Sequence, residues 1–212
     1  MFPEAVSDLT RTYTPAEMLT HAIALPPGDR GTFSYSNTNY LLLGRLVEAV
    51  DGGDLGESLE RRITTPLGLV DTWFDTNDRP APTDLAAGWF PGVFDGDPDT
   101  PYTAISSGAW AAGALISTVE DLETFLDAPV GGKLLSNDMF DAMTDTGDNA
   151  YGFGIGEAGL GAAGAGWYHS GVITGYQATM GITSDGDASI VIATNADRLD
   201  AGDFAGQILV QL

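Results

Sequence analysis

The hydrophobic pattern of this chain changes its period once, near residue 150. Before that point, apolar residues recur every three or four positions, as in "TNYLLLGRLVEAVDGG" from residue 38, which is typical of an amphipathic helix that ends at glycine. After it, "YQATMGITSDGDASIVIATNAD" alternates or runs apolar, is rich in β-branched residues, and contains Asp185-Gly186, a pair typical of a hairpin turn. Helices followed by antiparallel strands, three or so, predict an α+β fold.

Capping signals predict where the helices begin. Thr14, Pro15 and Glu17 match an N-cap, a first helical residue and the last residue of a capping box, so a helix is expected from residue 15. The N-cap candidates of the helices after residue 115 are Ser117, with Glu120 three residues later, and Ser136 or Asn137. The further expected helices span residues 37–51, 55–66, 117–128, 134–144 and 200–212.

The organisation of the chain follows from this pattern. At 212 residues it is long enough for one domain or two small ones. We expect a mainly helical region over residues 1–110 and a partial α/β region over residues 111–212. Residues 71–101 are rich in loops and proline, and loops of this length more often form the wall or lid of a functional site than serve as plain connections.

The charge excludes whole classes of partner. Thirty acidic residues stand against eight basic ones, and the formal net charge of -22 would repel both nucleic acid and an anionic membrane surface. Lys133 is the only lysine. An acidic surface of this kind repels itself in dilute buffer and tolerates concentrated salt, where the Debye length falls to ~3 Å at 1 M. The composition therefore favours a halophilic source, the alternative being an ordinary acidic mesophilic protein.

The same composition limits the chemistry. There is no cysteine, which excludes disulfides, thiol catalysis and cysteine-based zinc sites, and His21 and His169 form no metal-binding pair in the sequence. The "GIGEAG" match at residues 154–159 lacks the following helix that a dinucleotide needs, and the acidic loop at residues 95–100 lacks the glycine of a calcium loop. We therefore expect no cofactor and no metal.

No segment indicates export or membrane insertion. The first residues have no signal-peptide pattern, and no apolar run reaches the ~18 residues of a membrane span. The expected compartment is the cytoplasm by default, or the extracellular side if a longer N-terminus exists.

Two tripeptides carry candidate chemistry. Tyr35-Ser36-Asn37 opens the second helix, and His169-Ser170-Gly171 falls on an expected strand. Each has a purely structural alternative, because Asn37 could be a helix N-cap, Tyr35 a core aromatic residue and His169 a strand residue with a satisfied ring.

In this order and with these flanks, the two motifs resemble those of the serine β-lactamase and D-alanyl-D-alanine peptidase family, in its class C, esterase-like branch. The resemblance implies a partial β-lactamase-like (DD-peptidase) fold, with a helical region, C-terminal antiparallel strands and a closing helix. It implies that Tyr35 works in proton transfer and that Asn37 contacts the substrate's amide.

The resemblance also assigns roles on the strand. His169 would act as a proton relay or electrostatic partner, and Ser170 would contribute to substrate binding. Gly171 would let substrate backbone approach, and the N–H of Val172 would be one donor of the oxyanion hole, the pair of N–H groups that stabilises the reaction's oxyanion. The implied reaction is acyl transfer from an ester, an amide or a D-amino-acid peptide.

One element of that family is missing from these 212 residues. Its nucleophile lies in an S-x-x-K motif, but Lys133 has Val130 three residues earlier, and no G-x-S-x-G motif occurs. We therefore expect no acyl-enzyme chemistry from this chain alone, the N-terminal strands and nucleophile helix to be lacking, and an exposed sheet edge that invites self-association or a partner chain. Two alternatives remain open: a non-catalytic binding or regulatory module, or an α/β domain whose motif match is accidental.

Overall fold

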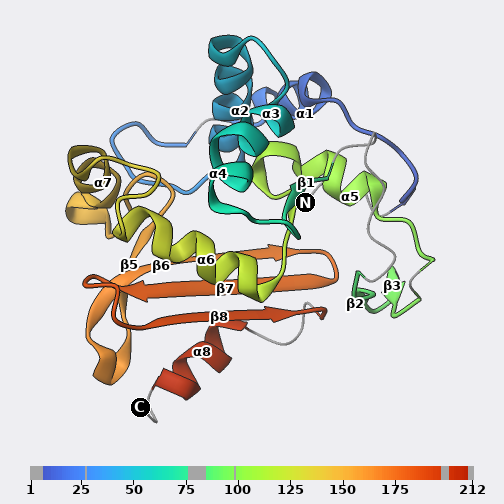
Figure 1. The fold of residues 1–212 in the computed structure, drawn as a ribbon. Helices are drawn as coiled ribbons and strands as arrows, with labels where there is room; N and C mark the ends of the chain where they lie inside the picture. Colours follow the sequence, from blue (N-terminus) through green and yellow to red (C-terminus); the bar gives the residue numbers. More distant parts are fainter. Residues whose placement is uncertain (1–6, 27, 76–84, 98, 197–200, 210–212) are drawn as a thin grey trace. The chain divides into compact units, whose positions relative to one another are not determined.

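The computed structural model describes residues 7–26, 28–75, 85–97, 99–196 and 201–209 (Figure 1). The chain forms two compact units and passes between them several times. The first unit comprises Met1–Pro66, Thr72–Ala87 and Asp97–Ile116; the second comprises Leu67–Asp71, Gly88–Gly96 and Ser117–Leu212. Helices and antiparallel strands are both present, which confirms the expected α+β class.

The first unit is mainly helical. Its elements are α1 (Pro15–Ile23), α2 (Asn37–Asp51), α3 (Leu55–Leu59), a π-helical turn η2 (Glu60–Thr64), α5 (Thr103–Ala109), a 3₁₀ turn η3 (Trp110–Ala112), and the short antiparallel pair of β1 (Trp73–Phe74) and β4 (Leu115–Ile116). The short helix α4 (Thr65–Leu67) follows η2 where the chain leaves this unit. Pro66 lies within α4, at the expected end of this helical stretch.

The expected ends of α1 and α2 are confirmed. The Thr14 hydroxyl accepts a hydrogen bond from the Glu17 N–H at 3.2 Å, and the Glu17 carboxylate accepts one from the Thr14 N–H at 2.8 Å, which completes the capping box. At the other end of α2, Gly52 is left-handed with φ 73° and donates its N–H to the Glu48 carbonyl at 2.9 Å. Both helix ends are thus fixed by local sequence.

α2 packs through one narrow face. Leu41 and Gly44 are its buried residues, and a Cβ at Gly44 would lie 2.6 Å from the Ala111 Cβ and 2.8 Å from the Trp110 ring. Because glycine has no Cβ, the helix can approach η3 this closely. The contact with η3 therefore decides which side of α2 is covered within this unit.

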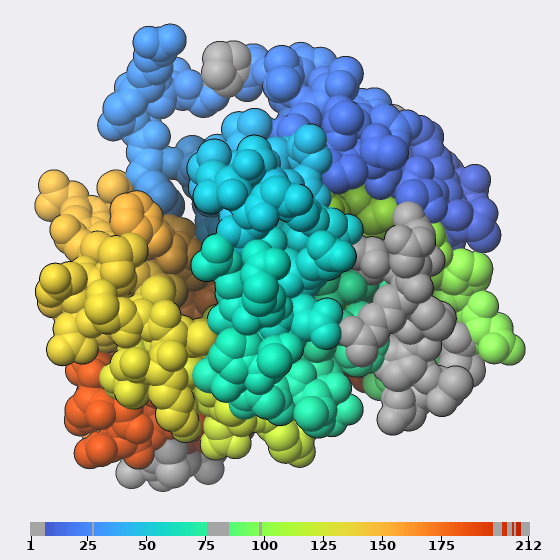
Figure 2. Space-filling view, turned by 45° about the horizontal axis from the view of Figure 1, so that its top comes forward, coloured from blue at the N-terminus to red at the C-terminus, as the bar shows by residue number. Residues whose placement is uncertain are grey.

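The rest of the apolar stripe of α2 faces outward. We call it the α2 apolar face; its side chains are between 36% and 75% exposed, and its members are Leu42, Leu43, Leu46, Val47 and Val50. The segment that leads into α2, residues 28–35, is exposed as well and forms the light blue loop in Figure 2. A contiguous apolar surface of this kind typically marks an interaction site.

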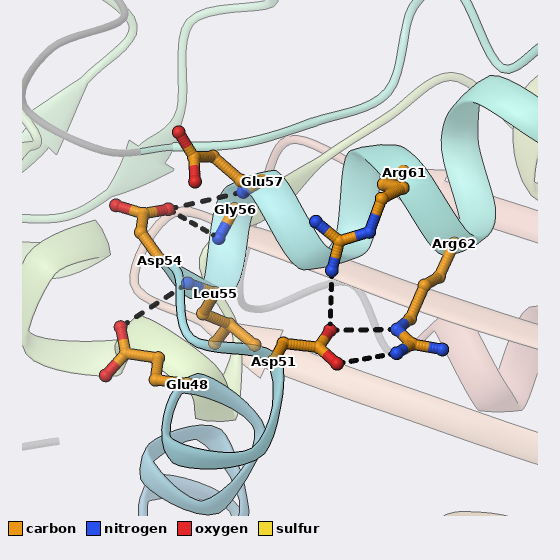
Figure 3. A network of polar contacts seen from close by, with 8 residues as sticks. All are labelled: Glu48, Asp51, Asp54, Leu55, Gly56, Glu57, Arg61 and Arg62. Atoms are coloured by element: carbon orange, nitrogen blue, oxygen red, sulfur yellow. Dashed lines mark hydrogen bonds and ion pairs between the residues drawn. The ribbon is translucent and has the colours of Figure 1, made fainter.

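A cluster of ion pairs joins the end of α2 to η2 (Figure 3). The Asp51 side chain, only 7% exposed, accepts two hydrogen bonds from Arg62, at 2.5 and 2.8 Å, and one from Arg61 at 2.9 Å. Asp54 caps α3 by accepting the N–H groups of Gly56 and Glu57. The bidentate geometry of the Arg62 pair makes it a strong contact between these elements.

The second unit is built on a four-stranded antiparallel sheet with the strand order β5-β6-β7-β8. The strands are β5 (Gly156–Gly159), β6 (Ala165–Ile173), β7 (Tyr176–Thr183) and β8 (Ser189–Thr194), with a small hairpin of β2 (Trp89–Phe90) and β3 (Phe94–Asp95). α6 (Val119–Val130) and α8 (Ala201–Leu209) both pack against β7 and β8, and α7 (Asn137–Thr144) precedes β5. No helix in the described ranges is long and apolar enough to cross a membrane.

Local predictions in this unit had mixed outcomes. The expected turn at Asp185-Gly186 is confirmed, with Gly186 at φ 80° and its N–H bonded to the Thr183 carbonyl at 2.9 Å. Ser136 rather than Asn137 caps α7. The cap predicted at Ser117 is wrong, because Thr118 has the extended backbone of an N-cap and its hydroxyl accepts the Asp121 N–H at 3.2 Å.

The first testable prediction concerns Asp51. Its arginine partners, Arg62 before Arg61, hold the pKa of the Asp51 carboxyl well below its ordinary value of about 3.9. A carboxyl with a lowered folded-state pKa stabilises the fold above its unfolded-state pKa, and this stabilisation is lost as the pH falls. We expect Asp51→Asn to lower the urea midpoint at pH 7 and the difference from the wild type to shrink below about pH 4.

A matched control separates the ion pair from the change in net charge. Glu123→Gln removes the same charge from an exposed position on α6 and should leave the midpoint nearly unchanged. Because both arginines are more than half exposed, molar salt should weaken the effect of Asp51→Asn. Equal effects of the two variants at pH 7 would contradict a specific role for this cluster.

Candidate functional site

The first candidate motif begins α2. Ser36 is the N-cap by its extended backbone, with φ -147° and ψ 122°, although its side chain makes no capping hydrogen bond. Asn37 is the first helical residue and its side chain is exposed. The alternative interpretation of Asn37 as the N-cap is therefore wrong, and its carboxamide is not used to begin the helix.

Tyr35 lies on the surface of the first unit. Its side chain is 49% exposed, so it is not a core residue, and its ring lies 5.4 Å from that of Tyr40, centroid to centroid. Partial burial, and then the neighbouring Tyr40, raise the pKa of Tyr35 to about 12. At neutral pH the group is a protonated phenol. To accept a proton in a reaction it needs a cation beside it, because a nearby positive charge lowers the pKa of a phenol.

The second motif lies on β6. His169 is half-buried, and its Nε2 lies 3.0 Å from the hydroxyl of Tyr151. Burial lowers the pKa of His169 below its ordinary value, because the charged imidazolium is less well solvated there than the neutral ring. The residue is therefore a neutral imidazole at pH 7, with one ring nitrogen already engaged.

The hydrogen-bond pattern of β6 shows which N–H groups of the motif are open. In an antiparallel pair, the bonds to the neighbour alternate along the strand. The bond from the Ser184 N–H to the Ala165 carbonyl, at 3.0 Å, shows that the odd-numbered residues of β6 pair with β7. The N–H groups of Ser170 and Val172 must then point away from β7.

β5 ends before it reaches these groups. Its pairing with β6 stops at Gly156 and Tyr168, so Ser170 and Val172 lie beyond it. Neither N–H has a hydrogen-bond partner among the residues that the structure describes. Apart from its two chain neighbours, no heavy atom of the described residues lies within 4 Å of a Cβ built at Gly171, and the Val172 side chain is 71% exposed. The strand thus offers two adjacent outward donors with open space between them.

The candidate residues fall in both units. Tyr35 and Asn37 belong to the first unit, and His169 to Val172 belong to the second. The sequence motifs do not single out Tyr151, whose hydroxyl meets the ring of His169, 18 residues further along the chain. Over the described ranges, no three His, Asp or Glu side chains are close enough together to hold a metal ion.

Comparison with known proteins identifies similar molecules. The family model described as Beta-lactamase matches residues 2–211. A D-stereospecific amidohydrolase from a Streptomyces species is 27% identical, with a TM-score of 0.81, and the match covers 97% of this chain and 63% of that one. The D-amino acid amidase of Ochrobactrum anthropi SV3, in complex with D-phenylalanine, is 25% identical, with a TM-score of 0.78 and coverages of 95% and 64%.

A third structure shares the fold alone. The octameric penicillin-binding protein homologue from Pyrococcus abyssi is 24% identical, with a TM-score of 0.77, and the match covers 93% of this chain and 47% of that one. The chain therefore spans less than two thirds of the length of each of these proteins. The matches confirm the β-lactamase-like fold that the sequence motifs predicted.

The second testable prediction concerns the titration of His169. With only two histidines in the chain, His169→Gln assigns its resonances directly. We expect the midpoint to lie below the ordinary value of about 6.5. Between about pH 6.5 and the lower midpoint of the folded state, the unfolded state binds more protons than the folded state. The free energy of unfolding should therefore fall as the pH drops through this range.

Two measurements check this. The NMR titration gives the midpoint, and urea unfolding between pH 5 and 8 gives the linked change in stability, which His169→Gln should reduce. His21→Gln, at an exposed position of α1, should leave the His169 midpoint unchanged. A midpoint at or above 6.5 would show that burial does not control this ring.

Proposed function

Because this chain belongs to the beta-lactamase family, we propose that it is the substrate-binding part of a serine hydrolase that transfers an acyl group from an ester, an amide or a D-amino-acid peptide to water. The observation that carries the proposal is the open stretch of β6, where His169, Ser170, Gly171 and Val172 lie beyond the end of β5. A substrate backbone can add to such a stretch as a further strand.

Each residue of the stretch has a role in this proposal. The Ser170 N–H, with Gly171 providing the space, holds the substrate's backbone beside the strand. The Val172 N–H donates to the oxygen of the tetrahedral intermediate, where one such donor typically contributes about 10²–10³ in rate. His169 relays a proton or supports the charge that develops. Tyr35 and Asn37 complete the set, with Tyr35 in proton transfer and Asn37 on the substrate's amide.

Two of the similar proteins favour an amide of a D-amino acid among the three substrate classes. One is a D-stereospecific amidohydrolase, and the other is a D-amino acid amidase in complex with D-phenylalanine. In such a reaction the serine oxygen forms a bond to the carbonyl carbon, the C–N bond breaks, and the amine leaves with a proton. Water then attacks the acyl-enzyme, releases the acid and returns the proton to the serine.

The nucleophile of this reaction has to come from outside these 212 residues. No S-x-x-K occurs in them, and partial burial, followed by the neighbouring Tyr40, raises the pKa of Tyr35 to about 12. The alternative function, a non-catalytic binding or regulatory module, rests on the same two observations. It predicts that substrate analogues bind along β6 without turnover.

The third testable prediction is the absence of covalent labelling. We expect the purified 212-residue chain, of 22.1 kDa, to form no stoichiometric adduct with a penicillin or a fluorophosphonate probe in intact-mass spectra. A one-to-one adduct that persists in the folded protein and is lost on denaturation before labelling would contradict the missing nucleophile.

The source of the nucleophile can be tested in the organism's own cells. A native protein clearly heavier than 22.1 kDa that carries S-x-x-K and takes the label would support the hydrolase. Tyr35→Phe and His169→Gln in that form should each lower the labelling rate about 10²- to 10⁴-fold, the usual contribution of proton-transfer groups. Binding without labelling in the heavier form would instead favour the binding module.

We further propose that a polypeptide segment completing the fold covers surfaces that this chain leaves open. One is the α2 apolar face. The other is the outer edge of β8, where the backbone N–H and C=O groups of Ser189, Val191 and Ala193 point away from β7 and have no strand partner among the described residues. The strand "SIVIAT" carries no charge and no proline, the usual devices that block edge pairing. Without the segment, the chain should pair with a second copy.

The fourth testable prediction concerns this edge. Val191→Pro removes an N–H that points outward, so it should keep the β7 ladder and shift the mass measured by light scattering in molar salt toward the monomer. Ile192→Pro is the matched control, because its N–H bonds β7 and its loss should destabilise the sheet.

A second variant separates the two surfaces. Leu46→Ser reduces the α2 apolar face, whose Leu46 side chain is 57% exposed, and should leave association through β8 unchanged. If the wild type is a monomer at all concentrations in molar salt, the edge is not an interaction site.

A further inference from the structure

Tyr151 lies in a tightly constrained turn between α7 and β5. The preceding residue, Ala150, is left-handed at φ 54° and ψ 26°, a conformation that is unfavourable for a residue with a Cβ. Tyr151 itself forms an isolated antiparallel bridge with Gly156, at the start of β5. The backbone is therefore strained at Ala150, the residue that precedes Tyr151.

Backbone hydrogen bonds hold this turn on each side. The Ala150 carbonyl accepts the Glu157 N–H at 3.0 Å, and the Gly152 N–H donates to the Ile155 carbonyl at 2.8 Å. A Cβ at Gly152 would lie 2.1 Å from the Met143 carbonyl oxygen, so the turn is packed against the end of α7. These contacts fix the backbone from which the Tyr151 side chain extends.

The phenol of Tyr151 meets only one of the two ring nitrogens of His169. Its hydroxyl is 3.0 Å from Nε2, and the two rings lie 6.2 Å apart, centroid to centroid. Among the described residues, Nδ1 of His169 has no hydrogen-bond partner. In a neutral imidazole, the bond made at one nitrogen decides which nitrogen carries the proton.

We propose that Tyr151 is a positioning residue that donates its phenolic proton to Nε2 of His169, holds the imidazole proton on Nδ1, and thereby presents Nδ1–H as the donor that the ring offers to a substrate. The first two parts concern this chain alone, and the last rests on the proposed hydrolase function. A phenol O–H is a better donor than an imidazole N–H, and an unprotonated imidazole nitrogen is a better acceptor than a phenol oxygen, which sets the direction of the bond.

Glu157 and Tyr168 are titratable groups beside this part of β6. Glu157, on the neighbouring strand β5, is hydrogen-bonded to the Thr146 hydroxyl. Tyr168 precedes His169 on β6, so its side chain points to the opposite face of the sheet, where it packs over Gly156. Met180 lies opposite His169 on β7. A neutral hydrogen bond, unlike an ion pair, is not screened by salt, so it can fix the ring in concentrated salt as well as in dilute buffer.

NMR of the ¹⁵N-histidine-labelled chain tests the proposal. Long-range ¹H–¹⁵N spectra, recorded above the titration midpoint, distinguish the two tautomers. We expect the wild type to have its proton on Nδ1, both in dilute buffer and in molar salt. Tyr151→Phe should change the tautomer ratio toward Nε2–H about fivefold, the effect of one ordinary neutral hydrogen bond, and should raise the His169 midpoint.

Controls keep the result specific. Ala150→Gly relieves the left-handed backbone and keeps the phenol, so it should retain the wild-type tautomer. A wild-type ring protonated on Nε2 would overturn the proposal, and this result needs no variant to fold. An unchanged ratio in a folded Tyr151→Phe protein would overturn it as well. Neither outcome depends on covalent labelling, so the proposed function and the positioning role fail separately.

Discussion

The register between β6 and β7 is the constraint on which the candidate site depends. Side chains and N–H groups alternate along a strand, so a slip of one residue would turn the Ser170 and Val172 N–H groups into the sheet and move His169 to the other face. The register is fixed by the two-residue turn at Thr174 and Gly175, where Gly175 has φ 87°. The hairpin of β6 and β7, with its two-residue turn, therefore determines where the N–H groups of Ser170 and Val172 point.

The same sheet supplies rigidity where the proposed chemistry needs it. β5 covers β6 only as far as Tyr168, so one strand is an internal strand at its start and an edge at its end. The turn that carries Tyr151 is tied to the beginning of β5, just where this transition occurs. Donors that are fixed before a substrate arrives cost no reorganisation during the reaction, which is how such sites stabilise a developing charge.

Sequence alone predicted the features that depend on neighbouring residues. The capping box of Thr14 and Glu17 and the turn at Asp185-Gly186 were correct because their hydrogen bonds join residues that are close in the chain. The cap at Ser117 was displaced by one residue, since Thr118 can cap equally well and only the backbone angles decide. The boundary near residue 110 and the roles of Tyr35, Asn37, His169 and the residues after it stay predictions.

Features set by tertiary contacts could not be predicted in this way. The spacing of Leu42, Leu46 and Val50 indicates a helix, but which face is covered depends on Trp110, whose ring fits against Gly44. Tyr151 was missed for the same reason, because its partner lies 18 residues away on a strand whose register the sequence does not state. The composition around His169 indicates a strand, but it does not show which ring nitrogen of His169 the Tyr151 hydroxyl contacts.

The α2 apolar face has a consequence for how this protein behaves as a colloid. In dilute buffer the net charge of -22 keeps two copies apart, although each exposes a row of leucines and valines. Concentrated salt removes that repulsion within a few ångströms of the surface and at the same time strengthens the attraction between apolar groups when the salt is a kosmotropic one. Charge repulsion and apolar attraction thus oppose each other, and the ionic strength sets the balance between them. The molecules stay dispersed at low ionic strength and adhere to one another at high ionic strength.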